Sequence, residues 1–144
     1  MFKKIDHINI SVTDIEESKK FFIDLLGFRL EKEGELKGEW IENVVGLQNV
    51  KAIYARLFLP NTETFLELIE YRNPVGKKDE KISRANKIGF RHLAFEVKDI
   101  EKIYKKLKKE GVKFLSEIQV NNNQKKLCYF LGPDGIILEL AEYN

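Results

Sequence analysis

The chain contains two copies of one sequence pattern, and each copy holds one of the two histidines. Residues 7–16 read HINISVTDIE, and 85 positions later residues 92–101 read HLAFEVKDIE, so that His7 coincides with His92. A second match, at an offset of 72, lays residues 54–71 over 126–143 without a gap. It pairs Phe58 with Phe130, Leu66 with Leu138, Glu67 with Glu139, Leu68 with Leu140 and Tyr71 with Tyr143. A chain built this way is predicted to fold as two similar modules.

Each copy opens with the alternation of a half-buried strand, followed by a helical pattern. From His7 to Val12 apolar and polar residues alternate, which places His7 on the face opposite the aliphatic row. Asp14, with Glu17 three residues later, is a predicted N-cap, and Gly27 is a predicted helix end. In the second copy Asp99 is predicted to cap a helix that Gly111 ends.

Further strands are predicted after each helix, so each module is expected to be β-α-β-β-β. Their ranges are Phe28–Lys32, Val50–Leu59 and Thr64–Tyr71 in the first module, and Val112–Ile118, Lys126–Leu131 and Ile136–Tyr143 in the second. The predicted fold class is therefore α+β, as a single domain over residues 1–144 with module 1 (4–72), a linker (73–88) and module 2 (89–144). The first module carries thirteen extra residues within about Glu33–Asn49, and their apolar content, including Trp40, suggests a lid or a partner contact.

Composition excludes several functional classes. The 25 basic and 23 acidic residues are interleaved and give a net charge of only +2, so we expect no nucleic-acid partner. No apolar run approaches the roughly 20 residues of a membrane span, and the N-terminus has no signal-peptide pattern, so we expect a cytoplasmic protein without a membrane partner. The single cysteine, Cys128, lies mid-strand and is interpreted as a packing residue.

The repeated histidines and glutamates predict a metal site. Two imidazoles and two carboxylates, His7, Glu67, His92 and Glu139, suit one divalent ion such as Ni, Co, Zn, Mn or Fe. Each glutamate shares its strand face with apolar residues, where a carboxylate is costly to bury unless a positive charge meets it. The alternative is that the histidines are structural and that both glutamates face solvent, as Glu70 and Glu142 are expected to do.

The same residues carry a resemblance to the vicinal oxygen chelate superfamily of glyoxalase I, methylmalonyl-CoA epimerase, extradiol dioxygenases, fosfomycin-inactivating thiol transferases and bleomycin-resistance proteins. It spans residues 4–143. Its motifs are Asp6-His7-Ile8, Asp14-Ile15-Glu16, Phe21-Phe22 to Leu26-Gly27-Phe28, Leu66-Glu67-Leu68, His92-Leu93-Ala94-Phe95, Val97-Lys98-Asp99-Ile100, Gly132-Pro133-Asp134-Gly135 and Leu138-Glu139-Leu140. The resemblance implies paired modules forming a mixed, curved sheet around an open cup that binds one metal through the four ligands named above, and it implies a homodimer.

The activity that the resemblance favours is that of a glyoxalase I-type lyase or isomerase acting on a small-molecule substrate. In such enzymes the metal holds vicinal oxygens and a glutamate, here Glu139 or Glu67, removes a proton next to a carbonyl. To hold glutathione, glyoxalase I would have an arginine on the first strand and a polar residue shortly after Glu67, but this chain has Ser11 and Tyr71 near those places, so the use of glutathione or coenzyme A stays open. The alternatives are a methylmalonyl-CoA epimerase-like isomerase and a non-catalytic drug-binding protein that uses Trp40, Tyr54, Phe58, Phe65 and Tyr129.

Overall fold

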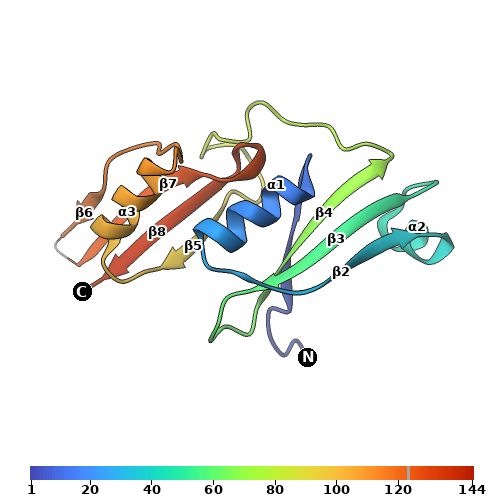
Figure 1. The fold of residues 1–144 in the computed structure, drawn as a ribbon, viewed down its shortest axis with the longest axis horizontal. Helices are drawn as coiled ribbons and strands as arrows, with labels where there is room; N and C mark the ends of the chain where they lie inside the picture. Colours follow the sequence, from blue (N-terminus) through green and yellow to red (C-terminus); the bar gives the residue numbers. More distant parts are fainter. Residues whose placement is uncertain (123) are drawn as a thin grey trace. The chain divides into compact units, whose positions relative to one another are not determined.

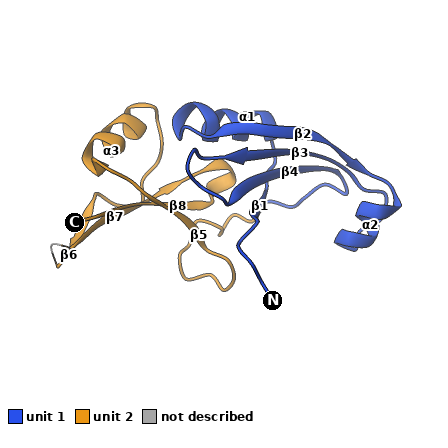
Figure 2. Cartoon of the chain, turned by 90° about the horizontal axis from the view of Figure 1, so that it is seen from below, with its two compact units in different colours: residues 1–78 blue, residues 79–144 orange. Residues whose placement is uncertain are grey.

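The computed structural model describes residues 1–122 and 124–144, which divide into two compact units (Figures 1 and 2). Unit 1 covers Met1–Lys78 and unit 2 covers Asp79–Asn144. Each unit forms its own four-stranded sheet, with strand order β1-β4-β3-β2 in unit 1 and β5-β8-β7-β6 in unit 2. In both sheets the first strand runs parallel to the last, and the other neighbours are antiparallel. The predicted α+β fold of two repeated modules is confirmed.

Unit 1 follows the predicted order with one added helix. Its elements are β1 (His7–Ser11), α1 (Ile15–Lys20), a π-helical turn (Phe21–Leu25), β2 (Arg29–Lys37), α2 (Glu39–Val45), β3 (Lys51–Phe58) and β4 (Phe65–Asn73). Unit 2 contains β5 (His92–Glu96), α3 (Ile100–Lys109), β6 (Gln119–Asn121), β7 (Lys125–Leu131), a 3₁₀ turn (Pro133–Gly135) and β8 (Ile137–Tyr143). None of the helices in the described residues combines the length and the apolarity needed to cross a lipid bilayer.

The first helical segment begins and ends where the sequence predicts, but it is α-helical only in α1 and continues as the π-helical turn up to Leu25. The Glu17 N–H donates to the Asp14 carboxylate at 3.0 Å, which satisfies one of the free donors of the first turn. The chain leaves the π-helical turn through Gly27 at φ +80°, a conformation that costs a residue without Cβ little. Helix α1 packs on β3 and β4, and Phe22 of the π-helical turn is fully buried, as are Leu57 and Leu68 of these strands. This face of the sheet is therefore the hydrophobic core.

The extra residues of the first module form regular structure. They lengthen β2 as far as Lys37 and then fold as α2, which Figure 2 shows beyond the end of the sheet, on the side away from α1. Ile41 anchors α2 in a small cluster with Val50, Ala52 and Ile69, whereas Trp40 is 70% exposed. The prediction of a lid or partner contact did not include a helix, because seven residues carry too few turns to show a clear helical period.

Two predictions for unit 2 were wrong in detail. Val112–Ile118 is not a strand: it makes one isolated bridge, from Phe114 to Phe130, because Phe114 packs its ring between Tyr104 and Phe130 rather than extending a ladder. Asp99 occupies the N-cap position of α3 but has φ +61° and makes no side-chain cap.

The carboxylate that caps α3 comes from β8 instead of from the helix start. Glu142 accepts hydrogen bonds from the backbone N–H groups of Asp99 and Ile100. The expectation that Glu142 faces solvent was therefore wrong, because its side chain is only 17% exposed, and Glu70, at 18%, is likewise half-buried.

The gapless match between the two hairpins is shifted by one residue in its first strand. Leu57 lies opposite Leu66 and Phe130 lies opposite Leu138, so Phe130 corresponds to Leu57 and not to Phe58. The cause is the connecting turn, which spans residues 59–64 in unit 1 and the shorter 132–136 in unit 2. A slip of one residue exchanges the two faces of a strand, and Phe58 is accordingly only half-buried while Phe130 is fully buried.

Candidate functional site

A row of polar residues crosses the unit 1 sheet on the face away from α1. In the strand register Lys32 lies opposite Arg56, Arg56 opposite Glu67, and Glu67 opposite Asn9. Directly paired residues project from the same face of a sheet, so these four side chains form one line. His7, two residues before Asn9 on β1, projects from the same face.

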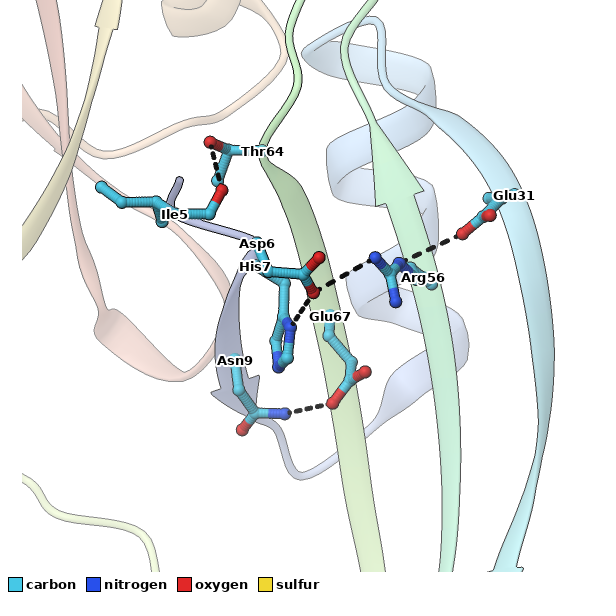
Figure 3. A network of polar contacts seen from close by, with 8 residues as sticks. All are labelled: Ile5, Asp6, His7, Asn9, Glu31, Arg56, Thr64 and Glu67. Carbon is cyan, nitrogen blue, oxygen red and sulfur yellow. Dashed lines mark hydrogen bonds and ion pairs between the residues drawn. The ribbon is translucent and has the colours of Figure 1, made fainter. Parts of the chain in front are cut away.

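The His7 ring is oriented by the residue before it. Its Nδ1 lies 2.7 Å from Oδ2 of Asp6, which in turn pairs with Arg56 at 3.4 Å (Figure 3). The hydrogen bond from His7, together with the Arg56 charge, lowers the pKa of the Asp6 carboxyl below its usual value of 3.8. An Nδ1 proton donated to Asp6 leaves the lone pair on Nε2, which is the form of imidazole that binds a metal.

Glu67 is held at one oxygen only. The Asn9 amide donates to its Oε1 at 3.0 Å, and among the described residues Oε2 has no hydrogen-bond partner (Figure 3). Asn9 thus fixes the direction of the carboxylate while one oxygen stays open for a ligand.

His7 and Glu67 border a pocket of about 480 Å³ that lies wholly within unit 1. Its other walls are Asn9, Lys32, Leu36, Tyr54, Arg56, Ile69 and Tyr71 from the sheet, and Trp40, Ile41, Val44 and Val45 from α2. This size is within the range of small-molecule sites, and a mostly apolar lining with a few polar groups is typical of them. Two of the five aromatic residues expected to bind a drug, Trp40 and Tyr54, line this pocket, whereas Phe58, Phe65 and Tyr129 do not.

In unit 2 the histidine and the glutamate contact each other directly. His92 Nε2 lies 3.1 Å from Oε2 of Glu139, and the His92 ring packs against Tyr129 with centroids 5.0 Å apart. Glu139 is 5% exposed and is the one buried carboxylate among the described residues. Burying an ionised carboxylate is unfavourable unless cations or donors compensate it.

Lys125 compensates the charge of Glu139 with an ion pair. Its ammonium group lies 3.3 Å from Glu139 Oε1 and sits over the Tyr143 ring at 5.2 Å. Hydrogen bonding to Tyr143 and to Glu139 raises the pKa of Lys125 above its usual value of 10.5. Sequence reasoning did not identify Lys125, Asp6 or Asn9, although their positions beside or on the same strand face as the candidate ligands were a usable signal.

The donor atoms fit a divalent ion. Two cis ligands about 2.1 Å from one octahedral ion are roughly 3 Å apart, which matches the 3.1 Å between His92 Nε2 and Glu139 Oε2. In unit 1 the Nε2 of His7 and the Oε2 of Glu67 are free to accept. Over residues 1–122 and 124–144, no group of three or more His, Cys, Asp or Glu side chains lies close enough together to hold a metal ion.

Cys128 takes no part in this arrangement. It is 1% exposed, and burial, with a smaller effect of the Glu139 charge, raises the pKa of its thiol to about 11. Its interpretation as a packing residue agrees with this burial.

Comparison with known proteins agrees with the fold. The chain is 34% identical over 143 residues to the uncharacterized protein YaeR of Escherichia coli (strain K12), covering 97% of this chain and 96% of YaeR. It is 37% identical over 82 residues to glyoxalase I of Saccharomyces cerevisiae, which covers 55% of this chain and 25% of that protein.

Among solved structures, a glyoxalase family protein from Bacillus cereus superimposes with a TM-score of 0.91 at 28% identity, covering 99% of this chain and 95% of that one. Residues 4–140 match the model of a family described as Glyoxalase/Bleomycin resistance protein/Dioxygenase superfamily. Because this match covers nearly the whole chain and the structure has the two repeated modules, the chain belongs to the Glyoxalase/Bleomycin resistance protein/Dioxygenase superfamily.

Proposed function

We propose that this protein is a divalent-metal-dependent lyase or isomerase of the glyoxalase I type. His7, Glu67, His92 and Glu139 are the proposed ligands of one ion, two from each unit, whether the units belong to one chain or to two chains of a homodimer. The observation that carries the proposal is the His92–Glu139 pair, a buried carboxylate at the spacing of neighbouring metal ligands. A cytoplasmic location belongs to the same proposal.

When bound, the ion supplies Lewis-acid polarisation of a substrate carbonyl oxygen. The two glutamates of the chain then have different proposed roles. Glu139 has both oxygens engaged, by His92 and by Lys125, which suits a fixed ligand. Glu67 has one open oxygen and borders the pocket, which suits the carboxylate that accepts the proton from the carbon next to the carbonyl and returns it.

Two measurements test this function. Elemental analysis of the purified protein is expected to find about one divalent ion per His7–Glu67–His92–Glu139 set. In D₂O, the metal-loaded protein is expected to exchange the proton next to the carbonyl of a bound substrate. Two substrates are tested separately: methylglyoxal together with glutathione tests the glyoxalase activity, and methylmalonyl-CoA tests the epimerase activity.

The two glutamates are expected to respond differently to substitution. Glu67→Gln keeps much of the metal but loses about 10²–10⁴-fold in proton exchange, the usual contribution of a general base. Glu139→Gln loses the metal itself. Equal metal contents in the two variants, with equal activity, would contradict the division of roles.

The second candidate function, a binder of drug-like molecules, is favoured by the pocket of unit 1 with its exposed Trp40. A binder is expected to hold its ligand equally well after His7→Ala and Glu139→Ala substitution and to catalyse no proton exchange. Retained binding without any metal requirement would favour this candidate over the enzyme.

A further inference from the structure

We infer that the unit 1 pocket recognises a substrate that carries an aromatic or similarly large apolar group next to an anionic group, and that Lys32 binds the anion. The inference rests on the proposed function only in placing the reacting oxygens of the substrate beside His7 and Glu67. The pocket, its apolar wall and its cation are features of unit 1 alone.

The volume argues for a large substituent. A pocket of about 480 Å³ exceeds what a methyl group beside a dicarbonyl can fill. Tyr54, one of the aromatic residues of the pocket, lies opposite Gly34 in the strand register. A Cβ at position 34 would come within 3.3 Å of Tyr54 Cε1, so the missing side chain lets the tyrosine ring lie close over β2. A flat wall of this kind is suited to stacking against a ring.

Two large apolar side chains of α2 are exposed to solvent beside the pocket. Ile41 anchors the helix in the core cluster, yet Trp40 and Val44, 70% and 65% exposed, are left at the pocket. Large apolar side chains exposed together are typical of binding surfaces. A ring placed between Trp40 and Tyr54 would remove this area from water. Unit 2 has no equivalent of α2 within its described residues, so the feature is specific to one half of the repeat.

Two cationic side chains, Lys32 and Arg56, line the pocket, and they differ in their partners. Arg56, the neighbour of Lys32 in the polar row, forms ion pairs with Asp6 at 3.4 Å and with Glu31 at 3.1 Å, although its buried Nε makes no hydrogen bond. In contrast, the Lys32 ammonium group has no acidic or hydrogen-bond partner anywhere in the described chain, although Glu67 lies only two strands away. Lys32 is exposed at the rim of this pocket, where its ammonium group can pair with an anion that enters it.

These features together define the ligand class: a small acid with a ring, in which the carboxylate reaches Lys32 and the neighbouring oxygens reach His7 and Glu67. Trp40 is the single tryptophan of the chain, so its fluorescence reports directly on occupation of the pocket. Phenylglyoxylate is the probe that carries the ring, the vicinal oxygens and the charge. Glyoxylate lacks the ring, and 2-oxo-2-phenylacetamide lacks the charge.

The experiment titrates the three probes into metal-free and metal-loaded protein. Phenylglyoxylate is expected to change Trp40 fluorescence saturably in both forms, and to bind at least about tenfold more tightly than either analogue, since a charge-assisted contact or a buried ring each contributes one factor of ten or more. Equal affinity for the amide would overturn the role of Lys32. Equal affinity for glyoxylate would overturn the apolar subsite.

Matched variants locate the effect. Lys32→Met is expected to lower the affinity for phenylglyoxylate about tenfold and to leave the affinity for 2-oxo-2-phenylacetamide unchanged. Lys37→Met is the control, because Lys37 is on the same strand but on the opposite face, paired with Glu35 at 4.0 Å. Calorimetry of Trp40→Ala is expected to show weakened binding that Trp40→Phe restores. Identical losses in the Lys32 and Lys37 variants would contradict the inference.

The outcome is separable from that of the proposed function. Binding of phenylglyoxylate by metal-free protein, sensitive to Lys32, with no metal uptake and no proton exchange, supports the pocket and rejects the enzyme. Normal metal uptake and exchange with no saturable fluorescence change supports the enzyme and rejects this pocket.

Discussion

The two units place the same histidine–glutamate pair in different surroundings. In unit 1, His7 is 40% exposed and is held by Asp6, while Glu67 is half-buried beside a pocket. In unit 2, His92 contacts a glutamate that is almost fully buried. The repeat therefore preserved the candidate ligands and changed what supports them.

The supporting positions show how the difference arose. The residue before the histidine is Asp6 in unit 1 and Arg91 in unit 2, where Arg91 binds backbone carbonyls of Ile82 and Arg84 instead of the imidazole. Asn9, which holds Glu67, is replaced at the equivalent place by Ala94.

Unit 2 compensates for the missing amide with a cation from its third strand, Lys125, which lies against the buried carboxylate of Glu139. Glu139 is therefore held at both oxygens, whereas Glu67 is held at one and borders a pocket. The comparison teaches that one duplicated histidine–glutamate pair is enclosed by further contacts while the other borders a pocket with one carboxylate oxygen open.

The largest expected effect is on metal affinity in unit 1. Asp6→Asn removes the carboxylate that orients His7. The substitution is expected to lower the affinity for the metal about 10–100-fold, which is the usual cost of losing such a partner. Glu31→Gln is the control, because Glu31 also pairs with Arg56 but does not contact the histidine. Competition with a coloured chelator measures the affinity. If both variants lose affinity equally, Arg56 and not His7 transmits the effect.

The next effect concerns the enclosed pair of unit 2. Lys125→Met leaves the buried Glu139 without its cation, so the metal-free protein is expected to melt several degrees lower, and added metal is expected to restore most of the loss by supplying positive charge. Lys126→Met is the control, since Lys126 is adjacent but pairs with Glu101 and Glu142 away from the site. Thermal scans with and without metal measure both. A loss that metal leaves unchanged would show that Lys125 is merely structural.

The smallest effect concerns Cys128, which takes the place in unit 2 that Ala55 takes in unit 1. Both residues are buried, and they lie opposite Leu140 and Leu68 in the two sheets. Cys128→Ala is therefore expected to cost only about 1 kcal/mol of the free energy of unfolding, measured by urea titration. A cost of several kcal/mol would show that the two sheets are packed less alike than their registers indicate.

The thiol also gives a pH test. Folding raises the pKa of Cys128 from 9.0 to about 11, so the unfolded chain ionises first and stability is expected to fall as pH rises from 9 toward 11. At pH 8 the native thiol is expected to react with iodoacetamide at least about 100-fold more slowly than the unfolded one, since thiolate content drops tenfold per pKa unit. Equal rates would contradict the burial.

The fold was predictable because its signals are local. Alternation placed His7 opposite the aliphatic row, and the Asp14 cap and Gly27 bounded α1, since these depend on neighbours within one turn or one strand. The errors came from contacts distant in sequence. Glu142 caps α3 across more than forty residues, and one additional turn residue shifted the register that pairs Phe130.

The sequence by itself determined the duplicated α+β fold and named one histidine and one glutamate in each copy, because a repeat preserves residue type and strand parity. Only the tertiary structure decided that Asp6, Asn9 and Lys125 support those residues, and that α2 closes a pocket beside one pair alone. Partners across strands are chosen by register and turn length, and burial of a charge is decided by the surrounding packing. Neither property can be seen in a stretch of neighbouring residues.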